Sequence, residues 1–217
     1  MERIFFEGEA AQAITRKIKA LDGYESLVAM KPQSLQAFDV VVVRTSLRRL
    51  EVMVDVPLEH RYGLDRAERI LKIMSAISLQ IPLLKEIGSG LRHINLFSAI
   101  NGMYRDKNGG VLQSIKVRTS TGLLDHLRTT LTADDLRQNK YHTASTNAVN
   151  NEVDPFDILT RLDLTMPAAS VTIHLSASVG TLGGPPETRW LHGLEILDCV
   201  SQRDAIRAVN RVISFSS

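Results

Sequence analysis

Cysteine and aromatic residues are scarce in this chain: Cys199 is the only cysteine, and aromatic residues make up 5% of the sequence. A lone cysteine cannot form a disulfide within the chain, which is typical of proteins from a reducing compartment. No run of about 18 apolar residues occurs, so we expect no transmembrane segment. The first residues lack the order of a secretory signal, and we therefore expect a cytoplasmic protein.

Nucleotide and metal motifs are also missing. The sequence has no phosphate-binding loop of the G-x-x-x-x-G-K-[ST] type, and Gly88-Ser89-Gly90 lacks the third glycine of a dinucleotide fingerprint. None of the six histidines has another histidine four residues away, and none lies near the cysteine. The sequence therefore predicts no cofactor and no metal site.

A catalytic constellation is equally absent. His174 and Ser176 lie two residues apart on a predicted strand, outside the turn that exposes a nucleophilic serine. Asp154 and Asp157 are explained by the start of a helix, and Cys199 lies in an apolar stretch, which predicts a buried, inert thiol. We predict no catalytic residue, and this inventory favours a protein without enzymatic activity, although a site assembled from distant residues leaves no local motif.

The charge of the chain is small but unevenly distributed. Of the formal net charge of +2, residues 1–128 contribute +5 and residues 129–217 contribute −3. Such an asymmetry favours contact with an anionic partner, or head-to-tail contact between copies of the chain. A dedicated nucleic-acid binder usually has a denser basic cluster than this one.

Alternating segments predict a sheet. Residues 38–45 form a dense valine run, and in residues 50–56 apolar side chains alternate with Glu51 and Asp55, so the two segments predict an antiparallel hairpin. We expect Arg48 and Arg49 to be exposed at its turn. Residues 111–119 and 169–179 predict two further strands.

Helical spacing of apolar residues predicts helices over 9–21, 65–79 and 201–213, the last beginning at Ser201. Residues 123–131 also fit a helix, as do residues 154–161, where Asp154-Pro155 is a typical helix start. The polar residues 138–153 predict a long exposed loop. Together these elements predict a single globular domain over 1–217 of the α+β class, with a mixed, mostly antiparallel sheet and helices packed against it.

From Phe38 onward the order of these elements resembles the matrix proteins of rhabdoviruses, which are negative-strand RNA viruses. The segments FDVVVVRTSLRRLEVMV and SVTIHLSASV carry the resemblance. It implies a structural protein of the virion that self-associates and associates with membrane. The sequence departs from that family because Glu187 and Thr188 follow Pro185-Pro186, so the proline-rich budding motif ending in tyrosine is absent.

We therefore expect a non-enzymatic assembly protein that forms homo-oligomers and contacts an anionic surface, either a membrane or a ribonucleoprotein. Two alternatives stay open: a small-molecule or peptide-binding domain of bacterial or phage origin, including an unrecognised enzyme, and sequence-independent binding of nucleic acid, in which Arg44 would join the hairpin and helix arginines. The residues expected to contact the anionic surface are Arg16, Lys17, Lys19, Arg48, Arg49, Arg66, Arg69 and Lys72.

Overall fold

The computed structural model of the chain describes residues 2–7, 26–31, 39–54, 70, 72, 73, 75, 76, 92–130, 134–149, 152–163, 170–199 and 201–216. The chain divides into two compact units, residues 1–91 and 92–217, and each is described here by itself. The expectation of a single domain over the whole chain stays a prediction.

The first unit contains two antiparallel hairpins. Strand β1 (Glu2–Glu7) pairs with β2 (Ser26–Lys31), and β3 (Asp39–Arg44) pairs with β4 (Arg49–Val54). The second hairpin confirms the prediction made from the valine run, and its turn contains the short 3-10 helix η2 (Thr45–Leu47). Aliphatic residues fill both strands of this hairpin because β-branched side chains fit a pleated surface.

The side chains of Glu51 and Arg49 are more buried than the sequence predicted for this hairpin. Alternation placed Glu51 towards solvent, yet it is 8% exposed, because its Oε1 accepts hydrogen bonds from Arg44 Nε at 2.8 Å and Arg49 Nε at 2.6 Å. Burial alone would raise the pKa of Glu51, but these two guanidinium groups hold it below its usual value. Arg49 is therefore mostly buried in an ion pair, and the prediction that it is exposed was wrong.

Of the helix predicted over 65–79, the structure describes Ile70, Lys72, Ile73, Ser75 and Ala76, and all five are helical. The helix predicted over 9–21 lies outside the described residues.

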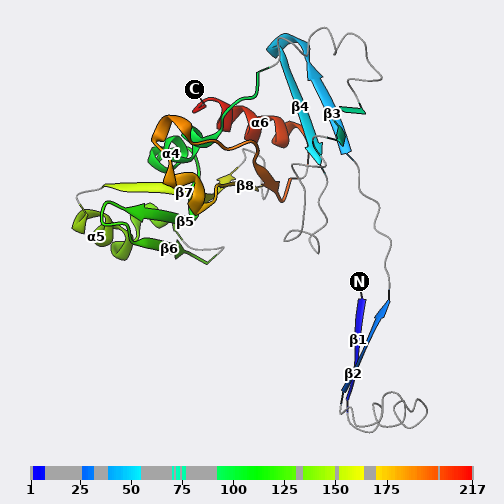
Figure 1. The fold of residues 1–217 in the computed structure, drawn as a ribbon, viewed down its shortest axis with the longest axis horizontal. Helices are drawn as coiled ribbons and strands as arrows, with labels where there is room; N and C mark the ends of the chain where they lie inside the picture. The colour runs from blue at the N-terminus through cyan, green and yellow to red at the C-terminus, as the bar shows by residue number, and fades with distance from the viewer. Residues whose placement is uncertain are drawn as a thin grey trace. The chain divides into compact units, whose positions relative to one another are not determined.

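The second unit is built on a five-stranded sheet (Figure 1). Its strands are β5 (Val111–Thr119), β6 (Leu124–Arg128), β7 (Val153–Asp163), β8 (Ser170–Ser176) and β9 (Glu195–Leu197). They lie in the order β6-β5-β7-β8-β9, and each neighbouring pair is antiparallel.

Three α-helices and three 3-10 helices complete the described part of this unit. Figure 1 shows α4 (Phe97–Arg105) and α6 (Gln202–Ile213) on the same side of the sheet. With α5 (Lys140–Ala148), they establish the predicted α+β class. The 3-10 helices are η4 (Leu136–Gln138), η5 (Val179–Gly183) and η6 (Pro186–Thr188).

The core lies between the sheet and the two helices α4 and α6. Ile100 of α4, Val212 of α6, and Ile115, Ile158 and Ile173 of three neighbouring strands are fully buried there. Burying each aliphatic side chain of this size contributes about 1.5–3 kcal/mol, so this layer is the main source of stability in the unit.

Two predicted helices are strands. Residues 124–128 form β6 where a helix was expected over 123–131, because the turn after β5 brings them back along that strand, with Gly122 at a φ of +83°. Residues 153–163 form β7 where a helix was expected over 154–161. Pro155 lies next to the register shift between Lys116 and Val117, and a bulge of this kind is one of the places where a strand accommodates proline.

The polar segment expected as a loop over 138–153 contains α5. Asn139 begins this helix by accepting a hydrogen bond from the Tyr141 backbone N–H at 2.9 Å. Its buried face consists of His142 and Thr146, one turn apart, and His142 Nε2 lies 3.1 Å from the Tyr104 hydroxyl. Burial lowers the pKa of His142 and raises that of Tyr104. Because polar residues form the inward face, the apolar pattern gave no signal of a helix.

Candidate functional site

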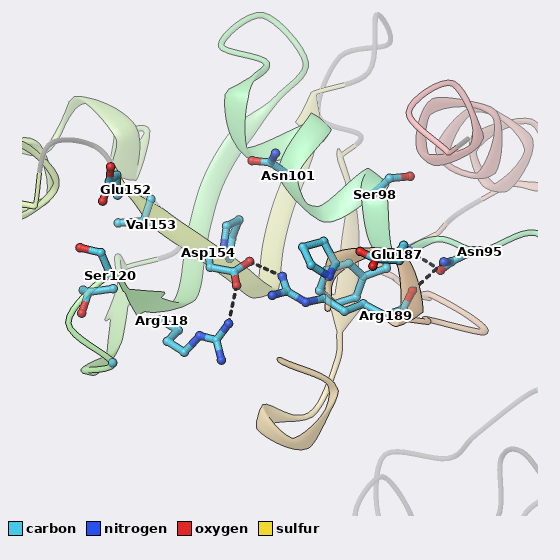
Figure 2. A pocket seen from close by; sticks show the side chains of 15 residues that line it. Asn95, Ser98, Asn101, Arg118, Ser120, Glu152, Val153, Asp154, Glu187 and Arg189 are labelled. Carbon is cyan, nitrogen blue, oxygen red and sulfur yellow. Dashed lines mark hydrogen bonds and ion pairs between the residues drawn. The ribbon is translucent and has the colours of Figure 1, made fainter. Parts of the chain in front are cut away.

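A groove of about 910 Å³ opens in the second unit (Figure 2). It is bounded by the first turns of α4, the end of β5 with the turn that follows, the start of β7, and η6. Its lining combines apolar surface with side chains that carry charges of both signs. The charged lining residues are Arg118, Glu152, Asp154, Glu187 and Arg189, and the hydrogen-bonding ones are Asn95, Ser98, Asn101, Thr119 and Ser120.

Two arginines share one carboxylate at the centre of the groove. Arg118 Nη2 lies 3.0 Å from Asp154 Oδ2, and Arg189 Nη1 lies 2.8 Å from Asp154 Oδ1 (Figure 2). Two cations and one anion leave this triad with a formal charge of +1. Because each guanidinium has five N–H donors, the pair keeps donors beyond those that Asp154 accepts.

Local structure fixes both arginines. Arg118 of β5 pairs directly with Asp154 of β7, and its Nη1 donates to the Leu182 carbonyl at 2.8 Å. Arg189 has a side chain that is only 9% exposed, and its guanidinium lies 5.7 Å from the ring centre of Phe97. Asn95 holds the backbone at this point, since its Nδ2 donates to the Arg189 carbonyl at 2.7 Å. A guanidinium held in this way is preorganised for a ligand.

Two further carboxylates stand at the edges of the groove. Glu152 directly precedes β7, and Glu187 belongs to η6; both are exposed. Neither forms an ion pair with another residue in the part of the chain that the structure describes. With Asp154 they give the groove three carboxylates against two guanidinium groups, which is a formal net charge of −1.

A second cluster crosses the face of the sheet opposite the core, and we call it the sheet-face network: Lys116, Asp157, His174, Ser176 and Glu195. Asp157 is its centre and is 3% exposed. Asp157 Oδ2 accepts from Ser176 Oγ at 2.5 Å and from Lys116 Nζ at 3.1 Å. His174 bridges two carboxylates, with Nδ1 3.0 Å from Glu195 Oε2 and Nε2 3.4 Å from Asp157 Oδ1.

The sheet-face network stabilises charged side chains. Hydrogen bonds to Asp157 and Glu195 raise the pKa of His174 to about 9. Burial alone would raise the pKa of Asp157, but hydrogen bonds from His174, Ser176 and Lys116 lower it to about 2. Ser176 donates to the carboxylate rather than to the imidazole, so the histidine is not placed to take its proton. This geometry fits a structural clamp across β5, β7, β8 and β9.

Among the described residues, no group of three or more His, Cys, Asp or Glu side chains is placed to hold a metal ion. No helix in the described ranges is long and apolar enough to cross a membrane. Cys199 is exposed, so the prediction that it is a buried core thiol was wrong. It lies in the loop after β9, and its Sγ is 3.2 Å from the Ser201 carbonyl oxygen.

The basic residues predicted to contact an anionic surface are only partly described. Arg48 is exposed at the β3–β4 turn with a left-handed φ of 47°, Arg49 is paired with Glu51, and Lys72 is exposed. The remaining five lie outside the described residues: Arg16, Lys17, Lys19, Arg66 and Arg69.

Sequence reasoning missed the groove. Asp154 was assigned to a helix start, and neither Arg118 nor Arg189 was selected. The two arginines lie 36 and 35 residues from Asp154 in the sequence, so no local spacing connects the three. A correct strand assignment for residues 153–163 would have placed Asp154 opposite Arg118, and this was the one available signal.

Comparisons with known protein families, with curated proteins and with solved structures found no match.

Proposed function

We propose that this chain is a binding protein that holds an extended, polar peptide segment in the groove of its second unit. The observation that carries the proposal is the Arg118–Asp154–Arg189 triad, which lines a groove of about 910 Å³. Sites for drug-like molecules are mostly apolar and bury most of the ligand. This groove is open, and the charged and hydrogen-bonding side chains in its lining suit a peptide whose amides and side chains form hydrogen bonds.

The lining supports a peptide over a nucleic acid or a membrane. The net charge of −1 among the charged lining residues disfavours a chain of phosphates, which proteins usually bind through a surplus of lysine and arginine. Asn101 and Ser120 are exposed at the groove and are placed to exchange hydrogen bonds with a peptide backbone. The two carboxylates at the edges offer partners for basic side chains.

Selection from a random peptide display library on the purified chain tests the proposal. We expect enriched peptides that bind with micromolar dissociation constants and that lose at least about tenfold in affinity, or 1.4 kcal/mol, for Ser120→Trp, because an indole at this exposed lining position fills the groove. Ala144→Trp is the matched control, since Ala144 is exposed on α5 and does not line the groove. Equal binding to both variants would place the peptides elsewhere and refute the proposal.

A second function, assembly on an anionic surface, is supported by the exposed Arg48 at the β3–β4 turn. It is the function expected from the resemblance to matrix proteins. Co-sedimentation with vesicles containing phosphatidylserine should be weakened by Arg48→Glu and by high salt, while neutral vesicles should not bind. Binding that is equal for neutral and anionic vesicles would contradict it.

A further inference from the structure

The arginine pair in the groove has one more positive charge than its carboxylate neutralises. Asp154 allows Arg118 and Arg189 to lie close together, since each guanidinium contacts a different carboxylate oxygen. Arg189 has two further fixed contacts, the Gly184 carbonyl at 3.4 Å from its Nε and the ring of Phe97. Both arginines line the groove, and each guanidinium has N–H groups beyond those used in these contacts. A fork of guanidinium donors matches the geometry of a carboxylate.

The carboxylates at the edges of the groove limit which kind of anionic ligand the two arginines can bind. Glu152 directly precedes β7 and Asp154 is the second residue of that strand, and both line the groove. An anion bound at the triad therefore shares the groove with Glu152, which forms no ion pair with another described residue. A dianionic phosphate would be repelled by Glu152, whereas a single carboxylate followed along the chain by a basic side chain would satisfy both positions.

We infer that the groove recognises the free C-terminal carboxylate of a peptide, bound by Arg118 and Arg189, with a lysine or arginine near that terminus paired to Glu152. This inference rests on the proposed function and names its ligand class. Arg189 is the buried, fixed half of the carboxylate site, and Arg118, with a side chain that is 32% exposed, is the half that a ligand reaches from solvent.

Titration of the ¹⁵N-labelled full chain, followed by amide chemical shifts, tests this with two defined probes: acetyl-Gly-Lys-Gly-Ala with a free carboxylate, and the same peptide as its C-terminal amide. We expect the acid to shift the amides of Arg118 to Gly122 and of Glu152 to Asp154, and to bind about tenfold more tightly than the amide, because a charge-assisted bidentate contact is lost. Equal affinity of the two peptides would overturn the inference without any protein variant.

Two sets of variants test the carboxylate contact and the lysine contact separately. Arg118→Gln should weaken binding of the acid about tenfold while leaving the amide unchanged, and Arg118→Lys, which keeps the charge but loses the fork, should fall between. Glu152→Gln should weaken the lysine peptide a few-fold and leave its norleucine counterpart unchanged. Arg203→Gln, exposed on α6, is the matched control. An Arg118→Gln effect of equal size on acid and amide would contradict a carboxylate contact.

Two further arms separate the outcomes. Inorganic phosphate that shifts the same amides at lower concentration than acetate would overturn the choice of a carboxylate. The display library carries peptides without a free C-terminus, so groove-binding library peptides together with equal affinity of acid and amide would refute this inference and leave the proposed function standing. Absence of any shift in the groove amides, with either kind of peptide, would refute both.

Discussion

Replacing His174 with glutamine removes one of the two cations of the sheet-face network and should change how stability depends on pH. In the folded chain the pKa of His174 is about 9, against about 6.5 for an unfolded histidine. When folding raises the pKa of a histidine, the protonated histidine stabilises the folded chain. This stabilisation is fully present below the pKa of the unfolded chain and is lost as the pH rises through the pKa of the folded chain. The difference of about 2.5 units corresponds to about 3 kcal/mol, at 1.36 kcal/mol per unit.

The carboxylate end of the same ion pair sets the lower limit of this pH range. The pKa of Asp157 is lowered to about 2, so its contribution is present above the unfolded value of about 4 and is lost as pH falls through 2. The two shifts describe one interaction from its two ends and are not added. The network therefore contributes most between about pH 4 and 6.5.

Urea denaturation followed by far-ultraviolet circular dichroism, at pH 5.5, 6.5, 8 and 9.5, measures the effect. Between pH 6.5 and 9.5 the wild-type chain should lose about 2–3 kcal/mol more unfolding free energy than His174→Gln, since other groups titrate equally in both. His126→Gln, an exposed histidine on β6, should retain the wild-type slope. Parallel pH profiles for wild type and His174→Gln would refute the reasoning.

Two other substitutions test how the second unit is held together. Arg137 is 6% exposed, pairs with Asp135 and donates to the carbonyls of Asp106 and Gly110, so Arg137→Met should lower the unfolding free energy by about 3–5 kcal/mol in urea, and a loss below about 1 kcal/mol would contradict this role. Gly110 has a φ of +126°, and an added Cβ would lie 2.6 Å from the Arg161 carbonyl oxygen. Gly110→Ala should therefore cost more than about 1 kcal/mol in thermal unfolding, whereas Gly183→Ala, with open space around it, should be neutral or slightly stabilising.

The fold was predictable where polar and apolar residues alternate cleanly or where a cap is explicit. The strand at residues 170–176 followed from its alternation, and the last helix from Ser201, whose side chain accepts from the Asp204 backbone N–H at 3.3 Å. The prediction failed at β7 because Pro155 is a helix-start signal that a β-bulge also accommodates. It failed at α5 because polar side chains, His142 and Thr146, form the buried face.

The candidate site was harder to predict from the sequence than the fold, for a physical reason. Arg118, Asp154 and Arg189 come together only when β5 and β7 pair and when the segment after η6 returns to the start of α4. The sheet-face network is similar, since Lys116 and Asp157 are 41 residues apart. His174 and Ser176 were correctly placed on one face of their strand, but the carboxylate that organises them lies on the neighbouring strand.

Hydrogen–deuterium exchange of the full chain, with and without a peptide from the display selection, tests the central claim most directly. The groove assignment predicts slower amide exchange at residues 118–122, 152–154 and 187–189, with the sheet-face network unchanged. Protection confined to other parts of residues 92–216, or the same protection in Ser120→Trp, would contradict it.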